Sequence, residues 1–123
     1  LSKLFKEIFT INWMKVILEE IEMMGFVEDE PLFFEIDSDI REYVLGRSKK
    51  CNGVINYCAV SRIHCGIYPR GISGNGSPAI IDFRSSNGTS INRELVGHSS
   101  EFYVNDGDEL TLGSRVKFKI SIK

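Results

Sequence analysis

The clearest secondary-structure signal in this chain is RVKFKISI, residues 115–122. Its apolar residues are Val116, Phe118, Ile120 and Ile122, and they alternate with Lys117, Lys119 and Ser121. A two-residue period places one set of side chains on one face of a β-strand and the other set on the opposite face. The segment therefore predicts a strand with one buried and one solvated face.

Upstream of this strand, back to residue 32, short apolar runs alternate with Gly- and Asn-rich punctuation. These runs predict strands at Leu32–Ile36, Glu42–Leu45, Val54–Tyr57, Cys65–Tyr68, Pro78–Phe83, Thr89–Asn92, Glu101–Val104 and Glu109–Leu112, before the last one at Arg115–Ile122. Many short strands with frequent turn signals are typical of a β-sandwich. We therefore expect an all-β, two-sheet domain over residues 32–123.

The first part of the chain has a different pattern. Residues 1–33 carry three Lys and seven acidic residues, a net charge of −4. Apolar residues fall at helical spacing in two groups, which are Leu1, Leu4, Phe5 and Ile8, then Trp13, Val16, Ile17, Ile21 and Met24. Residues 1–31 are therefore predicted to form a helical extension with a wide apolar face. We expect that face to pack on the sandwich, and docking on a partner or self-association with a second copy is the alternative.

Length and composition limit the classes of protein to consider. The chain has 123 residues, of which 42% are hydrophobic and 26% charged, so a single domain can bury a core without disulfides. Its net charge of −2 gives no general attraction to nucleic acid or anionic membrane, and neither is expected as a partner. No cofactor is expected either. The chain begins with Leu1 and not Met, which suggests a fragment of a larger protein such as a kinase.

Three cysteines, Cys51, Cys58 and Cys65, are spaced seven residues apart, with His64 beside the last. This spacing raises the alternative of a metal site, but structural zinc sites commonly use close C-x-x-C pairs, which this chain lacks. An odd number of cysteines does not fit a fully paired secreted domain. We therefore expect reduced cysteines in an intracellular protein and no metal.

Three polar clusters are not explained by the sandwich pattern. They are Gly46-Arg47-Ser48, Ser61-Arg62-Ile63-His64-Cys65, and Ser85-Ser86-Asn87-Gly88-Thr89 followed by Ile91-Asn92. Each cluster lies next to a predicted strand, so each can occupy a different loop at one end of the sandwich. Convergent Arg, Ser and Asn donors without an obvious acidic partner predict a site for an anionic, oxygen-rich group.

At these residues the sequence resembles the forkhead-associated (FHA) domain family. The matching elements are Leu45-Gly46-Arg47-Ser48, Val60-Ser61-Arg62-Ile63-His64-Cys65, Asp82 with Ser85-Ser86-Asn87-Gly88-Thr89 and Asn92, and Asn105-Asp106-Gly107-Asp108-Glu109-Leu110 with Leu112-Gly113. The resemblance covers residues 32–123. One departure is Asn92-Arg93, where the family often has Asn-Gly, and a differently shaped turn is expected there.

The resemblance implies an FHA/SMAD-like sandwich that binds phosphothreonine peptides through loops at one end. It implies phosphate contacts for Arg47, Ser61 and Arg62, and peptide contacts for Ser86 and Asn87. It implies scaffold roles for Gly46, His64, Gly88 and Asn92. It also implies recruitment of threonine-phosphorylated partners in intracellular signalling, with a nuclear location.

The chemistry of these residue types suits such a ligand. A phosphothreonine bears nearly two negative charges and three acceptor oxygens, and the arginine guanidinium matches them with a rigid fork of donors. Asn can donate to and accept from a peptide main chain at once. The ordinary alternatives are a surface ion pair of Arg47 with Asp37, Asp39 or Glu42, a strand start at Ser61, and simple turn chemistry at residues 85–87.

Two other functions need consideration. Ser61, His64 and Asp82 supply the residue types of a catalytic triad, but the sequence has no Gly-x-Ser-x-Gly elbow, so no catalysis is expected. The second alternative is a phosphate-independent interaction module that assembles through the sandwich and its N-terminal helix.

Overall fold

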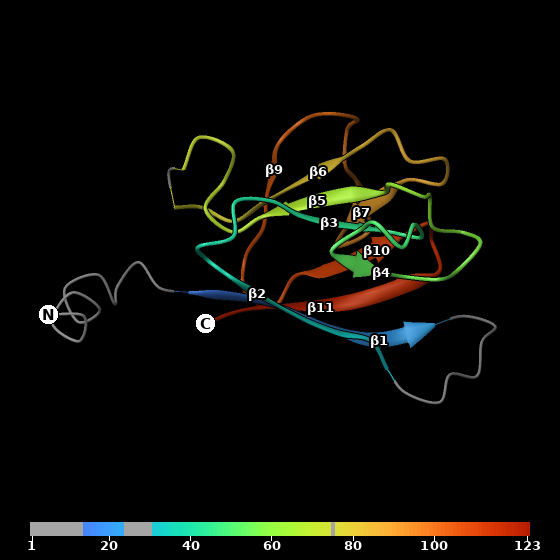
Figure 1. Ribbon diagram of the computed structural model, residues 1–123, viewed down its shortest axis with the longest axis horizontal. Helices are drawn as coiled ribbons and strands as arrows, with labels where there is room; N and C mark the ends of the chain where they lie inside the picture. Colours follow the sequence, from blue (N-terminus) through green and yellow to red (C-terminus); the bar gives the residue numbers. More distant parts are fainter. Residues whose placement is uncertain (1–13, 24–30, 75) are drawn as a thin grey trace, which may run out of the picture.

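The computed structural model describes residues 14–23, 31–74 and 76–123. Its strands form two sheets that pack face to face (Figure 1). The first sheet has six strands in the order β2 (Phe33–Asp37), β1 (Lys15–Met23), β11 (Val116–Ile122), β10 (Glu109–Leu112), β7 (Thr89–Ile91) and β8 (Glu94–Leu95). The second has five, in the order β4 (Gly53–Val54), β3 (Tyr43–Gly46), β5 (Cys65–Tyr68), β6 (Ala79–Asp82) and β9 (Phe102–Tyr103). The predicted two-sheet, all-β sandwich is confirmed.

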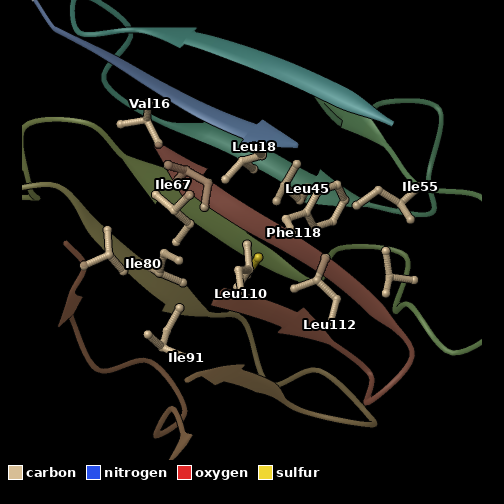
Figure 2. Close-up of a cluster of buried hydrophobic side chains, with 14 of the residues drawn as sticks. Val16, Leu18, Leu45, Ile55, Ile67, Ile80, Ile91, Leu110, Leu112 and Phe118 are labelled. Carbon is tan, nitrogen blue, oxygen red and sulfur yellow. The ribbon is translucent and has the colours of Figure 1, made fainter. Parts of the chain in front are cut away.

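The strand with the regular two-residue alternation, β11, lies inside the six-stranded sheet, between β1 and β10. Val116, Phe118 and Ile120 are fully buried, whereas Lys119 on the other face is exposed. Phe118 packs between the two sheets (Figure 2). The core cluster that contains Phe118 also includes Leu18 and Ile36 from the same sheet and Leu45, Ile67 and Ile80 from the other. The alternation read from residues 115–122 thus separates the core from solvent.

The predicted N-terminal helix is wrong over the residues that the structure describes. Residues 15–23 form β1, which pairs antiparallel with β11 on one side and with β2 on the other. Val16 and Leu18 are buried in the core, whereas Glu19 and Ile21 on the opposite face are exposed. The expected helical packing and helix-mediated self-association therefore lose their basis here. The rest of that prediction, residues 1–13 and 24–30, lies outside the described residues.

The sequence of β1 is compatible with either period, which explains the error. Val16, Ile17 and Ile21 fit one face of a helix, but all three are β-branched and also favour a strand. The register shifts between Glu20 and Glu22, and such a bulge interrupts the two-residue alternation that marks a strand. Pairing on both sides then decides between the two structures.

No described segment is a helix long and apolar enough to cross a bilayer.

Two shorter elements also differ from prediction. The strand expected at Val54–Tyr57 is reduced to Gly53–Val54, which pairs parallel with β3. A strand at Glu94–Leu95 was not predicted. It pairs with β7 through a two-residue turn at Asn92 and Arg93. Short edge strands carry little pattern because two residues cannot show a period.

The turn between β7 and β8 has the left-handed backbone that an Asn-Gly pair favours. Its φ angles are 51° at Asn92 and 69° at Arg93, as a type I′ hairpin turn requires. The different turn shape that was expected from Arg93 in place of glycine is therefore not seen. Instead, arginine occupies a conformation that suits glycine, at a cost of about 1–2 kcal/mol.

Replacing Arg93 by glycine should therefore stabilise the protein. Relief of the left-handed strain exceeds the extra entropy that glycine gains on unfolding, so the unfolding free energy should rise by about 0.5–1 kcal/mol. Urea denaturation monitored by fluorescence measures this change. Arg115→Gly is the matched control, because Arg115 also lies in a hairpin turn but has no positive φ. It should be neutral or destabilising, and an equal gain in both variants would contradict the strain explanation.

Candidate functional site

The sheet topology brings four loops to one end of the sandwich. Leu45 pairs with Cys65, and Cys65 pairs with Asp82, so the end of β3, the start of β5 and the end of β6 are neighbours. Thr89, at the start of β7, pairs with Leu112 at the end of β10. The loops 47–52, 55–64, 83–88 and 113–115 therefore gather at the right-hand end of Figure 1.

Arg47 follows β3 and is fixed against the loop that precedes β5. Its N–H donates to the Ser61 carbonyl at 3.0 Å, and its side-chain Nε donates to the Val60 carbonyl at 3.1 Å. The guanidinium is exposed, and it makes no ion pair with any described residue. The surface ion pair considered as its ordinary alternative is therefore not formed, and the terminal nitrogens can receive an anion.

Gly46 is required by the close approach of these two loops. A Cβ atom at this position would lie 2.2 Å from the Arg62 carbonyl oxygen, well inside any tolerated contact. The absence of a side chain lets the Ser48 N–H reach the same carbonyl at 3.1 Å. Glycine before Arg47 thus sets the spacing between the loops.

Buried His64 joins two of the loops from beneath. Its Nδ1 accepts from the Ser61 N–H at 3.0 Å, so the ring proton must lie on Nε2, which donates to the Gly88 carbonyl at 2.9 Å. Burial lowers the pKa of His64, although the bond to Gly88 opposes that shift. A neutral imidazole in one tautomer therefore holds the Ser61 backbone beside the loop 83–88.

Ser86 and Asn87 bond the loop that carries Ser61 at the surface. The Ser61 Oγ accepts from the Ser86 N–H at 2.9 Å, which leaves the hydroxyl proton available for a ligand oxygen. Asn87 donates from Nδ2 to the Ala59 carbonyl at 3.0 Å, and its Oδ1 has no described partner. Gly88 follows with φ of 86°, a conformation suited to glycine. With the Arg47 N–H bonded to the Ser61 carbonyl, sequence-predicted residues from three loops are thus brought together.

A buried carboxylate that supports this end was not assigned a role from the sequence. Asp82 is fully buried and accepts from Ser85 Oγ at 2.5 Å, Thr89 Oγ1 at 2.6 Å and His98 Nδ1 at 2.7 Å. The Ser85 N–H adds a fourth bond at 3.1 Å. Burial alone would raise the pKa of Asp82, but these hydrogen bonds outweigh it and lower the pKa. An Asp three residues before a Ser is a local turn signal that could have indicated part of this network.

The side chains of two predicted site residues, Asn92 and Arg62, take no part in the hydrogen bonds of this junction among the described residues. Asn92 lies in the β7–β8 turn, where it donates to Asp108 Oδ1 and accepts from the Glu109 N–H, both at 2.9 Å. It supports the neighbouring β9–β10 turn and does not contact the four loops. Arg62 lies between them but contributes its carbonyl, and its exposed side chain has no described partner.

The residue types of a triad are present, but their arrangement is different. Both ring nitrogens of His64 bond backbone groups, and the Ser61 hydroxyl bonds the Ser86 N–H. The Asp82 carboxylate faces Ser85, Thr89 and His98. No proton relay from Ser61 through His64 to Asp82 exists in this geometry.

The cysteines do not gather at a common point. Cys65 is buried in the core, Cys58 is exposed, and the Cys51 Sγ donates to the Arg62 carbonyl at 3.2 Å. Burial raises the pKa of the Cys51 thiol, which keeps it protonated. Within residues 14–23, 31–74 and 76–123, no three His, Cys, Asp or Glu side chains are placed to hold a metal ion.

Comparisons with known proteins agree with this fold. A family model described as FHA domain matches residues 43–113. The probable serine/threonine-protein kinase fhkC of Dictyostelium discoideum is 32% identical over 98 residues, which are 78% of this chain and 16% of that protein. Full-length yeast Pml1p has a TM-score of 0.71 at 19% identity, covering 89% of this chain and 83% of that one. Mycobacterium tuberculosis EmbR in complex with a low affinity phosphopeptide has a TM-score of 0.68 at 22% identity, covering 87% and 24%.

The chain belongs to the FHA domain family, because the family model matches more than half of its length. The resemblance stated from the sequence is thereby confirmed. The chain spans 16% of the length of fhkC and 13% of that of fhkA, a second Dictyostelium protein described as a probable serine/threonine-protein kinase.

Proposed function

We propose that this chain is a non-catalytic module that binds partner proteins phosphorylated on threonine. The observation that supports this most is the hydrogen-bonded junction of three loops, where Arg47, Ser61 and Asn87 keep hydrogen-bonding groups that no described residue uses. Hydrogen bonds already join their loops, because the Arg47 N–H donates to the Ser61 carbonyl, the Ser86 N–H to Ser61 Oγ, and Asn87 Nδ2 to the Ala59 carbonyl. A site ordered before the ligand arrives avoids much of the entropy cost of binding.

Each residue has a role that its present contacts allow. Arg47 binds phosphate oxygens with its terminal nitrogens, Ser61 donates its hydroxyl proton to phosphate, and Arg62 adds a further positive charge. Ser86 and Asn87 hold the peptide, with the Asn87 Oδ1 accepting from its main chain. The complex of EmbR, a protein with the same fold, with a phosphopeptide supports a ligand of this class.

The biological role that we propose is recruitment of phosphorylated partners in intracellular signalling. The probable serine/threonine-protein kinase fhkC contains a segment similar to this chain. By analogy, the module would bring a phosphorylated protein to a catalytic domain elsewhere in the same polypeptide. A nuclear location remains a prediction that only the family resemblance supports.

Binding to a phosphothreonine peptide library, with matched unphosphorylated, phosphoserine and glutamate versions, tests the proposal. Fluorescence anisotropy should show tight binding for phosphothreonine and little for the unphosphorylated and glutamate peptides. Phosphoserine should bind about five- to tenfold more weakly, because it lacks the γ-methyl group, whose burial stabilises by about 1 kcal/mol. Equal binding of the unphosphorylated peptides would instead support a phosphate-independent interaction module.

Affinity should also depend on pH through the ligand. The second ionisation of the phosphate lies near pH ~6, so affinity should fall as the pH decreases through that value. His64 does not reverse this trend, because burial lowers its pKa and it stays neutral until lower pH. Titrations between pH 5 and pH 8, about one unit below to two above that ionisation, measure the effect. A constant affinity across this range would contradict recognition of the dianion.

A further inference from the structure

The loops at the candidate-site end of this domain carry an excess of positive charge. The stretches 43–64, 83–93 and 110–123, which contain the four loops, include no Asp or Glu. Asp82 lies beneath the loops but is buried and saturated with donors. Glu22 of β1 lies opposite Lys117 of β11 and is the acidic position of the paired strands nearest this end. At the opposite end, acidic and basic residues are mixed, among them Asp37, Asp39, Asp106 and Asp108 with Lys15, Arg41 and Lys123. The net charge of −2 conceals the local excess in the loops.

The loop end carries more positive charge than one phosphothreonine can balance. Beyond Arg47 and Arg62, its exposed cations are Lys49, Lys50, Arg84 and Arg115, which we call the basic collar. None of the four forms an ion pair with a described residue. A phosphothreonine supplies nearly two negative charges, which match Arg47 and Arg62. The collar is therefore left for additional negative charge on the ligand.

The position and backbone conformation of Arg84 also point to a role in ligand binding. It is the third residue of a turn from Asp82 to Ser85, closed by the Ser85 N–H to Asp82 Oδ2 bond of 3.1 Å. Its φ of 54° is a left-handed conformation that glycine adopts without strain. Phe83 donates its N–H to the His64 carbonyl at 3.0 Å, so the backbone at Arg84 lies beside the Arg62–His64 segment. Arg93 has the same conformation, so it is the position of Arg84 in the loop 83–88, together with this strain, that points to a role at the site.

We propose that Arg84, assisted by Lys49, Lys50 and Arg115, selects ligands whose phosphothreonine is flanked by further anionic side chains. The ligand class is an acidic phosphothreonine segment, with the extra charge supplied by Asp, Glu or a second phosphate. This inference rests on the proposed function and adds a selectivity to it. Exposed charges act over about 8–10 Å at moderate salt, so the collar can attract anionic ligand residues that it does not contact.

Binding of three fluorescent phosphothreonine peptides to the intact chain tests the inference. The peptides have neutral flanks, flanks with aspartate or glutamate, or a second phosphothreonine. At low salt, the wild type should bind both anionic peptides about tenfold more tightly than the neutral one, since each exposed ion pair adds a modest gain. Salt should reduce this ratio. Comparison of the aspartate and second-phosphate arms identifies which anion is preferred.

Two Arg→Gly variants form a matched pair. Arg84→Gly should reduce the ratio to about threefold, and charge reversal in Lys49→Glu/Lys50→Glu should reduce it further. Thermal unfolding of Arg84→Gly should show an equal or higher Tm, which excludes loss of fold. Arg93→Gly removes the same charge and relieves the same strain, but in the turn that Asn92 joins to Asp108. It should leave the ratio at the wild-type value.

The outcomes separate this inference from the proposed function. Equal affinity of the wild type for all three peptides overturns the collar, although phosphothreonine binding stands. An equal fall of the ratio in both Arg→Gly variants also overturns it, since net charge alone would then explain selectivity. If no phosphopeptide binds, both proposals fail. Displacement of the anionic peptide by single-stranded DNA at lower concentrations than by unlabelled peptide would assign the collar to nucleic acid instead.

Discussion

Arg47→Ala is expected to weaken phosphothreonine-peptide binding by about a hundredfold or more. Two charge-assisted hydrogen bonds to phosphate, at about 1.5–3 kcal/mol each, are lost together. The terminal guanidinium nitrogens have no described partner within the protein, so their whole contribution goes to the ligand. Isothermal titration calorimetry with the preferred phosphopeptide measures the loss.

The same substitution should have a small effect on folding. Only the Nε bond to the Val60 carbonyl disappears, which is worth about 1 kcal/mol at this half-exposed position. Arg47→Lys is the matched variant, because it keeps the charge but loses the fork, and it should bind between the wild type and Arg47→Ala. Arg93→Ala controls for net charge and should bind like the wild type. Undiminished affinity of Arg47→Ala, with a normal melting curve, would remove the basis for the proposed site.

Asp82→Ala should be the most damaging substitution for stability. It leaves the Ser85 and Thr89 hydroxyls and the Ser85 N–H without their acceptor in a fully buried position. Removing one partner of a buried charged network costs about 3–5 kcal/mol, a large part of the stability of a domain of this size. Urea denaturation should show this loss. Because the variant can fail to fold, Thr89→Val provides a milder test with a loss of about 1–2 kcal/mol. Exposed Glu94→Ala should change stability by less than about 0.5 kcal/mol.

The same carboxylate should impose a pH dependence on stability. The pKa of Asp82 is lowered in the folded state, so the unfolded chain binds its proton more readily than the folded one. Its stabilisation is therefore complete above the unfolded value of about 3.9 and is lost as the pH falls through the lower folded pKa. Between about pH 6 and pH 2, the melting temperature of the wild type should fall steeply as the pH is lowered. Asp82→Asn should give a flatter curve, and parallel curves for the two proteins would contradict this role.

Local periodicity was sufficient for most of the sandwich and insufficient for its first strand. Residues 115–122 show an uninterrupted two-residue period because β11 is buried on one face along its length. In β1 the bulge near Glu20 interrupts that period, and the remaining apolar positions also fit a helix. The choice between the two depends on hydrogen bonds to β2 and β11, which local pattern does not contain.

In the candidate site, too, some residues are marked by local sequence motifs, whereas other contacts depend on the three-dimensional arrangement. Arg47, Ser61 and Asn87 could be found because short motifs mark them in consecutive loops. The contact of His98 with Asp82 could not, because it joins residues 16 positions apart through the arrangement of loops around β6. The basic collar was also invisible in the linear sequence. Its members are scattered from Lys49 to Arg115, and only the sheet topology gathers them at one end.

The pairing of β1 with β11 has a consequence for synthesis of the protein. Val16 faces Ile122, so the six-stranded sheet is completed by residues more than a hundred positions apart. During translation, β1 can pair with β2 early, but its other edge stays open until β11 has left the ribosome. Contacts so distant in sequence slow folding, and an open strand edge is prone to aggregate. The six-stranded sheet is therefore most exposed to aggregation before β11 emerges.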